Sequence, residues 1–202
     1  MSPGWRKEWH VGVRVKKEQK QEGDKPGLLV AFISAVPLKL RVREQEVQTG
    51  EVNFLCVHKK LRNKRLAPSL IKEITRRINR EGIWQGLYTG GTLLPTPITT
   101  TRYFHRPINW QRLYQLGFSQ LPAGTTQQMQ AIRFHVANSP SLAGFRDMKP
   151  EDTPKVRELL DRYLDRYDMV PRWDEAEFDH WVVDRTKDQK KRVVFAYVVE
   201  VS

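Results

Sequence analysis

Residues 51–68 of this 202-residue chain read EVNFLCVHKKLRNKRLAP, and this stretch decides the fold. The run from Val52 to His58 is almost continuously apolar, which is typical of a central strand with both faces covered. A basic turn follows the run, and the pattern then changes to an amphipathic helix that begins near Leu66. The apolar positions that recur at helical spacing are Leu70, Ile71, Ile74 and Ile78. The stretch therefore predicts a strand, a basic turn and a helix in succession.

The segments on either side of this unit predict an α+β fold. Alternating or continuous apolar patterns predict strands over residues 9–17, 28–36, 38–43, 83–89, 129–136 and 193–199. Helices are predicted over residues 109–116 and 174–182, and a third after Thr153, an N-cap residue with Pro154 at the first helical position. Residues 16–26 are predicted to form a hairpin connection, residues 95–101 a loop, and residues 138–144 a domain boundary.

Basic residues are concentrated in one part of the chain. The formal net charge is +12 and the pI is near 10, which favours a polyanionic partner. Residues 59–80 hold nine basic residues and one acid, a net charge of +8. A solvated helix face, a nucleic-acid surface and a site for a phosphate-bearing cofactor all fit this charge.

The basic turn ahead of the predicted helix suits a phosphate. A helix N-terminus leaves backbone N–H groups unpaired and carries partial positive charge. Arg62, Lys64 and Arg65 lie just before it and would add to a site for a pyrophosphate, such as that of coenzyme A. The sequence holds no GxxxxGKS motif, so an NTPase P-loop is not supported.

The single cysteine, Cys56, excludes an internal disulfide and favours a reducing compartment, so a cytoplasmic location is expected. Cys56 and His58 fall on the same face of the strand, as a nucleophile and its base would. A lone cysteine in an apolar strand is more often a small core residue, and that interpretation is preferred for Cys56. The histidines show no ligand spacing, so no metal site is predicted. The longest apolar run is too short to span a bilayer, so an integral membrane protein is not expected.

The same stretch resembles the N-terminal signature of the protein N-myristoyltransferases, also called glycylpeptide N-tetradecanoyltransferases. The likeness runs from Pro3 through Trp181 and includes Tyr88-Thr89-Gly90-Gly91, Arg102-Tyr103-Phe104-His105-Arg106 and Gly144-Phe145-Arg146-Asp147-Met148. The resemblance implies a GNAT-like acyl-CoA N-acyltransferase fold, in which helices flank a mixed twisted sheet. It implies that residues 1–137 form the myristoyl-CoA-binding domain. Residues 138–202 would begin a second, peptide-binding GNAT-like half, which is incomplete.

The resemblance also implies a reaction and a set of roles. A myristoyl group would pass from myristoyl-CoA to the N-terminal glycine amine of nascent proteins, by direct attack on the thioester and without an acyl-enzyme. The backbone N–H groups of Phe54 and Leu55 would form the oxyanion hole, which requires a bulged or splayed strand. Cys56 and Val57 would line the wall beside the thioester. The positions assigned to the coenzyme A phosphates are Arg62, Asn63, Lys64, Arg65, Leu66 and Ala67, with Asn63 where the family usually has serine. The positions assigned to the peptide are Thr89, Gly91, Tyr103 and His105.

Three features of the family are not found in these residues: an upstream aromatic segment, a Gly-rich motif in the C-terminal half, and a terminal carboxylate that serves as general base. A chain truncated at both ends is therefore expected, with poor turnover by itself. The alternative is a non-catalytic acyl-CoA-binding remnant. A nucleic-acid-binding module is less favoured, and no nucleic-acid partner is expected, because the aromatic residues lie in separate, mostly apolar segments rather than beside the basic cluster.

Overall fold

The computed structural model describes residues 3–16, 27–92, 94–137, 141–183, 186 and 188–200. The chain divides into two compact units. The first unit comprises Met1–Thr89 and Asp147–Tyr197, and the second comprises Gly90–Arg146 and Val198–Ser202. The predicted boundary near residue 137 stays a prediction. Of the hairpin connection predicted over residues 16–26, residues 17–26 lie outside the described residues, and of the boundary segment 138–144, residues 138–140 do.

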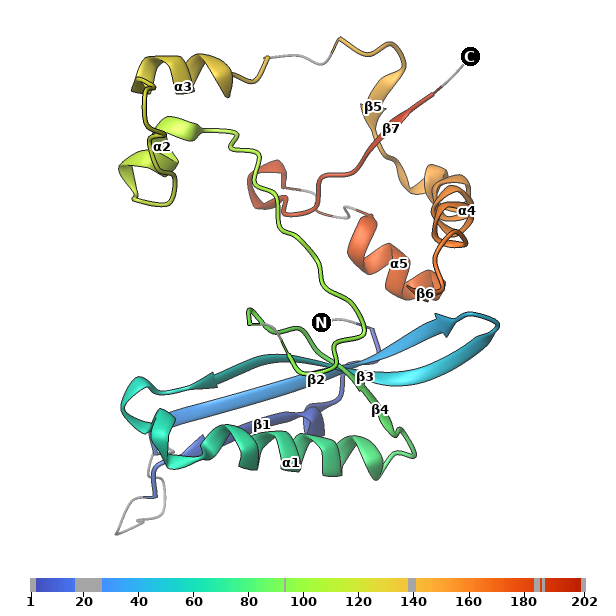
Figure 1. Cartoon of the computed structure of the whole chain (residues 1–202). Helices are drawn as coiled ribbons and strands as arrows, with labels where there is room; N and C mark the ends of the chain where they lie inside the picture. The colour runs from blue at the N-terminus through green and yellow to red at the C-terminus, as the bar shows by residue number, and fades with distance from the viewer. Residues whose placement is uncertain are drawn as a thin grey trace. The chain divides into compact units, whose positions relative to one another are not determined.

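The first unit is built on a five-stranded mixed sheet (Figure 1). Its strands are β1 (His10–Arg14), β2 (Leu29–Val42), β3 (Gln45–Val57), β4 (Gln85–Leu87) and β6 (Met169–Pro171). The order is β1-β2-β3-β4, and β6 pairs with the far end of β2. Strands β1, β3 and β6 run antiparallel to β2, whereas β3 and β4 are parallel. The predicted α+β class with a mixed sheet is confirmed.

Strand β2 is one long strand, so the prediction of two strands over residues 28–36 and 38–43 is wrong. Pro37 lies inside β2, opposite Gly50 of β3. A proline lacks the N–H that a sheet ladder needs, so it is normally confined to positions where that donor is not required. On its other side β2 pairs with β1 only as far as Ser34 and with β6 only from Leu40. Pro37 falls in the gap between these two pairings, where its missing N–H interrupts neither.

Helix α1 (Leu66–Asn79) covers one face of the sheet (Figure 1). The predicted helical spacing is confirmed for Leu70, Ile74 and Ile78, which are buried, whereas Ile71 is 47% exposed. The core cluster consists of Trp9, Val11, Ala31, Ile33, Ala35, Leu70, Ile74 and Ile78. A Cβ atom added at Gly50 would lie 2.8 Å from the Cδ1 atom of Ile78, so this glycine lets the helix approach β3 closely.

The other elements of the first unit include α4 (Thr153–Leu164) and α5 (Glu175–Val182). Helix α5 begins as predicted: Asp174 caps it, and Asp174 and Glu177 form a reciprocal capping box. In α4 the predicted cap Thr153 is the first helical residue instead, and a 3-10 turn, η3 (Pro150–Asp152), leads into it. The short 3-10 helices η1 (Lys7–Trp9) and η4 (Gln189–Lys191) complete this unit.

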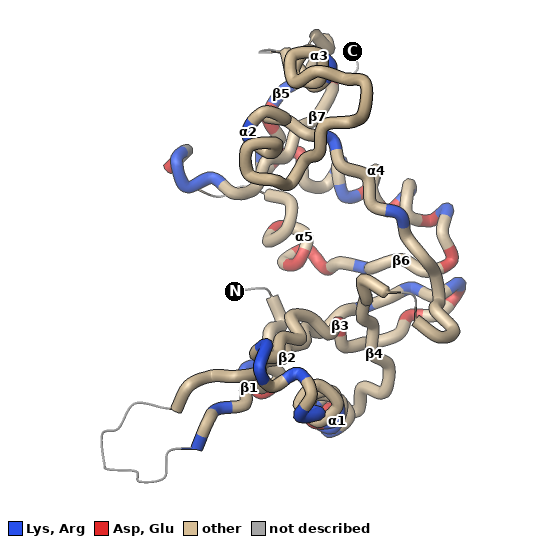
Figure 2. Tube along the Cα trace, turned by 60° about the vertical axis from the view of Figure 1, so that its left-hand side comes forward, with Lys and Arg blue, Asp and Glu red and all other residues tan. Residues whose placement is uncertain are grey.

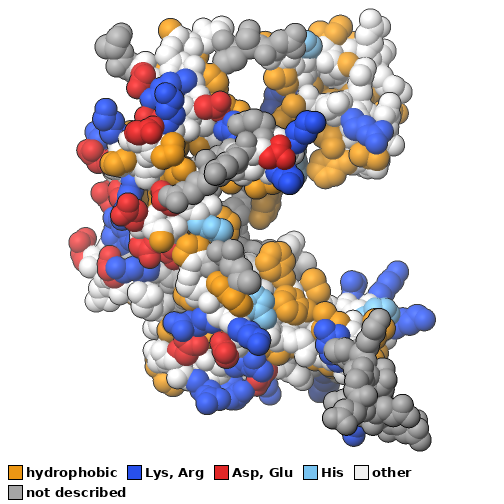
Figure 3. All heavy atoms as spheres, turned by 180° about the vertical axis from the view of Figure 1, so that it is seen from behind, with side chains coloured by type: hydrophobic (Ala, Val, Ile, Leu, Met, Phe, Trp, Pro, Cys, Tyr) orange, Lys and Arg blue, Asp and Glu red, His pale blue; other side chains and the backbone are white. Residues whose placement is uncertain are grey.

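The second unit contains α2 (Trp110–Gln115) and α3 (Gln127–Arg133). Helix α2 is confirmed, whereas the strand predicted over residues 129–136 is wrong because most of that segment belongs to α3. The Thr126 side chain accepts a hydrogen bond from the Met129 backbone N–H at 3.2 Å and so caps this helix. Strands β5 (Phe145–Asp147) and β7 (Tyr197–Val199) pair with each other, and β7 is much shorter than the strand predicted over residues 193–199. Hydrophobic side chains, orange in Figure 3, reach the surface of the molecule. Trp84 in the first unit is 72% exposed and Phe104 in the second is 83% exposed.

The carboxylate of Glu73 on α1 is held by two arginines. Arg76 Nε donates to it at 2.8 Å and Arg77 Nε at 2.7 Å. These two hydrogen bonds lower the pKa of Glu73 from its ordinary 4.5 to about 2. Because the folded pKa lies below the unfolded one, the ion pairs stabilise the fold above about pH 4.5 and lose that effect as the pH falls towards 2.

We therefore expect Glu73→Gln to lower the free energy of unfolding at neutral pH. The difference from the unsubstituted chain should shrink steadily as the pH falls from about 4.5 towards 2. Urea denaturation at a series of pH values measures this difference. Glu158→Gln on α4, where Glu158 pairs with Arg162 at 3.1 Å, controls for the change of net charge. A Glu73→Gln difference that stays constant over this pH range would contradict the assignment.

Candidate functional site

Strand β3 carries a bulge at Phe54 and Leu55. In the register with β2, Asn53 lies opposite Ser34 and Cys56 lies opposite Phe32. Phe54 and Leu55 therefore share the place opposite one residue of β2, Ile33, and neither has a partner in the register. One extra residue in a strand breaks the ladder locally. An oxyanion hole made by the N–H groups of Phe54 and Leu55 requires such a break in the ladder. That these two N–H groups form one stays a prediction.

Phe54 is strained at this bulge. Its φ is +57°, in the left-handed region that a phenylalanine rarely adopts. The side chain is 75% exposed, so packing of the ring offers little compensation. Strained backbone of this kind is concentrated at functional sites, where the surrounding structure holds it in place.

The second half of β3 has a free edge in the part of the chain that the structure describes. Strand β4 pairs with β3 only from Thr49 to Glu51. Beyond Glu51 the strand continues past the end of β4, and Phe54 and Leu55 are 75% and 43% exposed. The prediction that both faces of this strand are covered is wrong, because α1 covers only one face and the bulge leaves these side chains outside the core.

A basic turn connects this strand to α1. The backbone N–H of His58 donates to the Val30 carbonyl at 2.8 Å, which ties the end of β3 to β2. The 3-10 helix η2 (Lys59–Lys64) follows, and Arg65, with φ +55°, leads into α1. The Arg65 side chain does not cap α1, so it leaves the backbone N–H groups of the first helical turn open to another acceptor.

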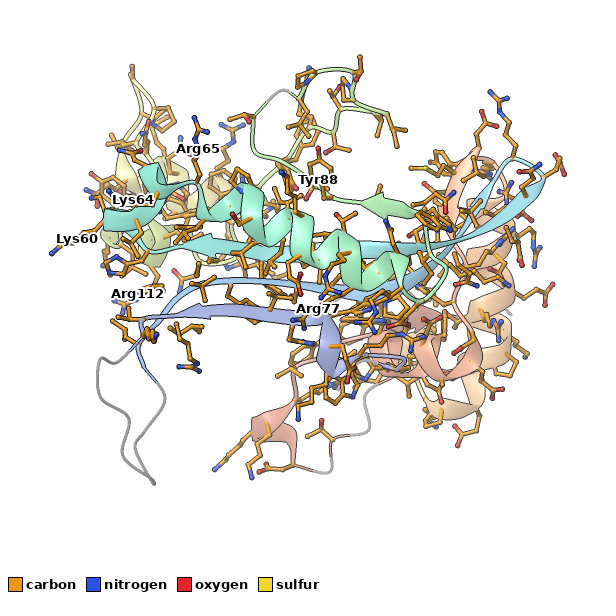
Figure 4. The ribbon with its side chains drawn as sticks, turned by 90° about the horizontal axis from the view of Figure 1, so that it is seen from below. Lys60, Lys64, Arg65, Arg77, Tyr88 and Arg112 are labelled. Atoms are coloured by element: carbon orange, nitrogen blue, oxygen red, sulfur yellow. The ribbon has the colours of Figure 1, made fainter. Side chains whose placement is uncertain are left out.

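The residues assigned to the phosphates surround this helix start. Arg62, Asn63, Lys64 and Arg65 are exposed, and Leu66 and Ala67 are half-buried. Basic residues, blue in Figure 2, recur along α1. The side chains of Lys60, Lys64 and Arg65 extend outward at the N-terminal end of this helix (Figure 4). A helix N-terminus with exposed cations around it is suited to an anion.

The prediction that Cys56 is a small core residue is wrong, because the residue is exposed. It lies immediately after the bulge and next to Val57, which packs against the core cluster, so its side chain points to the other face of the strand. The Nδ1 atom of His58 accepts a hydrogen bond from the Lys60 backbone N–H at 3.4 Å and so caps η2. This contact gives His58 a structural role at the start of the basic turn.

The residues assigned to the peptide are divided between the two units. Thr89 ends the first segment of the first unit, whereas Gly91, Tyr103 and His105 belong to the second. Tyr103 is 80% exposed. The ring of His105 packs edge-on against the ring of Phe118, with 5.6 Å between the two ring centroids. The first unit thus brings together the oxyanion, thioester-wall and phosphate positions, and the peptide positions are not gathered within one unit.

Comparison with known proteins decides the family. Residues 1–101 match the profile of the N-terminal domain of myristoyl-CoA:protein N-myristoyltransferase, and residues 115–202 match the profile of its C-terminal domain. The chain belongs to the N-myristoyltransferase family. The predicted family membership is confirmed, and the twisted mixed sheet of the first unit belongs to the GNAT-like fold of this family.

Individual N-myristoyltransferases are close in sequence and structure. The chain is 50% identical to glycylpeptide N-tetradecanoyltransferase of Neurospora crassa over 99% of its own length and 33% of that protein. It is 51% identical to the Candida albicans enzyme over 98% of its own length and 43% of that protein. The crystal structure of the Saccharomyces cerevisiae N-myristoyltransferase with bound myristoyl-CoA matches with a TM-score of 0.86 and 47% identity, over 99% of this chain and 44% of that one. The chain thus spans less than half the length of these N-myristoyltransferases.

Two properties of the site were not anticipated from the sequence. Ile33, which lies opposite the bulge, is fully buried, and Ser34 beside it is 5% exposed and hydrogen-bonded to the Asn53 carbonyl. The only signal for Ser34 was a single polar residue within an otherwise apolar strand. Among the described residues, no helix is long and apolar enough to cross a membrane.

Substitution of Phe54 tests the strained backbone of the bulge. Alanine and glycine both remove the exposed ring, but only glycine adopts a positive φ without steric cost. We expect the Phe54→Gly variant to be more stable than Phe54→Ala by about 1 kcal/mol, since the left-handed conformation costs an L-residue roughly that much. Urea denaturation of the two variants measures the difference. In an ordinary extended strand the order would be reversed, with Phe54→Ala the more stable, and that result would contradict the conformation of the bulge.

Proposed function

We propose that the first unit binds myristoyl-CoA and that the protein transfers the myristoyl group to the N-terminal glycine amine of proteins. The bulge at Phe54 and Leu55, on the strand that leads through the basic turn η2 to the start of α1, is the observation that carries this proposal. The relatives are named glycylpeptide N-tetradecanoyltransferases, and the Saccharomyces cerevisiae structure holds myristoyl-CoA. The proposed reaction is therefore a protein lipidation, and the cytoplasm is the proposed location.

In the proposed mechanism the thioester carbonyl oxygen receives hydrogen bonds from the backbone N–H groups of Phe54 and Leu55. These donors are the best candidates because neither residue is partnered by β2 in the register, and β4 ends before the bulge. Fixed donors aimed at an oxygen that becomes negative lower the barrier, because they need no reorganisation during the reaction. Cys56 and Val57 would form the wall beside the thioester.

The coenzyme A phosphates are proposed to bind at the start of α1. The guanidinium groups of Arg62 and Arg65 and the ammonium of Lys64 supply the charge, and the Asn63 side chain supplies a further hydrogen bond. The backbone N–H groups of Leu66 and Ala67 belong to the first turn, where donors lack intrahelical partners. Charge and unpaired donors at one helix end both favour a phosphate.

The acceptor peptide is assigned to Thr89, Gly91, Tyr103 and His105. Its α-amine, with a pKa of about 8 in a free peptide, must lose a proton before it can attack the thioester carbon. The amine nitrogen then forms the new bond to the acyl carbon, and the coenzyme A thiolate leaves. We further propose that residues 1–137 serve as the acyl-CoA-binding domain and that residues 138–202 belong to the peptide-binding half.

A binding titration followed by a transfer assay tests this function. We expect the purified chain to bind a non-hydrolysable myristoyl-CoA analogue saturably. Acylation of a peptide that begins with glycine should be slow, in keeping with the poor turnover expected of this chain by itself, and the same peptide beginning with alanine should not be acylated. Binding without transfer would favour the acyl-CoA-binding alternative. Absence of myristoyl-CoA binding would contradict the proposal, and oligonucleotide binding with a steep salt dependence would support a nucleic-acid module instead.

The exposed thiol of Cys56 permits a test of direct transfer. Because Cys56 is assigned to the wall, Cys56→Ala should leave the rate of transfer unchanged and no acyl-enzyme should be detectable by mass spectrometry. Cys56→Ser serves as the matched variant, since it keeps a weakly nucleophilic oxygen at the same position. If Cys56→Ala retained myristoyl-CoA binding but lost transfer, the cysteine would be the nucleophile and direct attack would be wrong.

A further inference from the structure

We propose that Ser34 is a positioning residue that holds the Phe54 N–H in the orientation needed for the oxyanion hole, an inference that rests on the proposed function. Ser34 lies on β2 directly opposite Asn53 of β3, at the last regular pair before the bulge. Its side chain is 95% buried, and its hydroxyl donates to the Asn53 carbonyl oxygen at 3.3 Å. A buried hydroxyl is satisfied only if it finds such an acceptor.

The Asn53 carbonyl and the Phe54 N–H belong to one peptide group. Because this group is planar and trans, its C=O and N–H bonds point in opposite directions. The hydroxyl of Ser34 therefore fixes the direction of the Phe54 N–H as well, by holding the oxygen at the other end of the same plane. A hydrogen bond accepted by the carbonyl also polarises the amide, which strengthens its N–H as a donor.

The strain at Phe54 shows why this orientation needs to be held. Rotation of the Asn53–Phe54 peptide plane by half a turn would carry the φ of Phe54 from +57° to the ordinary extended range near −120°. That rotation would relieve the left-handed conformation and would point the N–H the opposite way. The rotation would also remove the carbonyl oxygen from the buried Ser34 hydroxyl, so this contact opposes it.

Neighbouring contacts fix the strand but not this plane. The His58 N–H donates to the Val30 carbonyl at 2.8 Å, which ties down the strand after the bulge. Ile33, opposite the bulge in the register, is fully buried in the core cluster. Neither the His58 contact nor the burial of Ile33 acts on the Asn53 carbonyl oxygen, whereas the Ser34 side chain bonds to it directly.

The test compares Ser34→Ala, Ser34→Thr and Thr49→Val in the full 202-residue chain. Thr49 of β3 is a matched control, since it is 3% exposed and its hydroxyl has no hydrogen-bond partner in the described part of the chain. The probe is myristoyl-CoA labelled with ¹³C at the thioester carbonyl. Difference infrared spectroscopy reports the polarisation of that carbonyl when bound, and isothermal titration reports the affinity.

In the unsubstituted chain the carbonyl band should move to lower wavenumber on binding. Ser34→Ala should lose most of that shift with little change in affinity, Ser34→Thr should recover it, and Thr49→Val should leave it intact. A Ser34→Ala chain that binds with the full shift would overturn the role of Ser34 and leave the proposed function standing. An unsubstituted chain that does not bind, or binds without a shift, would overturn the proposed oxyanion site and this inference with it.

Discussion

Replacement of Arg65 by glycine is expected to weaken the binding of myristoyl-CoA about 10- to 150-fold, the equivalent of roughly 1.5–3 kcal/mol for a hydrogen bond to a charged group. Arg65 is exposed at the start of α1, with φ +55°. Glycine adopts this backbone conformation freely, so Arg65→Gly removes the guanidinium without adding strain. Alanine keeps a Cβ atom and with it the backbone strain that Arg65 already has, so Arg65→Ala should show the same loss of the guanidinium.

Arg43→Gly is the matched control for this experiment. Arg43 is also an exposed arginine with a positive φ, +53°, and it lies in the turn between β2 and β3. Arg43 comes just before β3, whereas Arg65 comes after β3 and η2. The two residues therefore lie beyond opposite ends of this strand. Isothermal titration with a non-hydrolysable analogue should show the loss of affinity for Arg65→Gly alone. Equal losses for both variants would indicate a general effect of net charge and would contradict a phosphate site at the helix start.

Replacement of Trp9 by alanine is expected to lower the free energy of unfolding by about 3–5 kcal/mol, the usual cost of removing a buried tryptophan. Trp9 is fully buried in the core between the sheet and α1, and its Nε1 donates to Glu81 at 2.8 Å. The substitution removes a large side chain from the core and leaves the Glu81 carboxylate without this donor. Urea denaturation followed by circular dichroism measures the change.

Trp84→Ala provides the comparison for Trp9→Ala. Trp84 is 72% exposed, so its removal should change stability by no more than about 0.5 kcal/mol. A Trp9→Ala variant as stable as Trp84→Ala would contradict the packing of η1 and β1 against α1. The prediction concerns the first unit, which holds both tryptophans.

Local patterns in the sequence were sufficient to predict α1 and α5. The helical spacing of Leu70, Ile74 and Ile78 identifies the buried face of α1, because each turn of a helix places such residues on one side. Helix α5 was predicted over residues 174–182, and the structure shows why it starts there: Asp174 and Glu177 form a capping box that involves only neighbouring residues. The strand before the basic turn was also evident, although β3 begins earlier than predicted, at Gln45.

The remaining errors concern properties that depend on distant parts of the chain. Pro37 is compatible with β2 only because neither β1 nor β6 pairs with the strand at that point. The exposure of Cys56 depends on the bulge before it, which sets the face of β3 to which the side chain points. The local apolar pattern does not show where a bulge falls. The segment over residues 129–136 is too short for its apolar spacing to distinguish a strand from a helix. The cap at Thr126 decides in favour of α3.

The proposed oxyanion role of Phe54 and Leu55 is tested most directly by nuclear magnetic resonance of their backbone amides. The measurement is a ¹H–¹⁵N titration of the chain, labelled at phenylalanine and leucine, with a non-hydrolysable myristoyl-CoA analogue that keeps the carbonyl oxygen. We predict that the amide protons of Phe54 and Leu55 move downfield on binding, because each donates a hydrogen bond to that oxygen. Saturable binding that leaves both resonances in place would contradict the oxyanion hole at the bulge of β3.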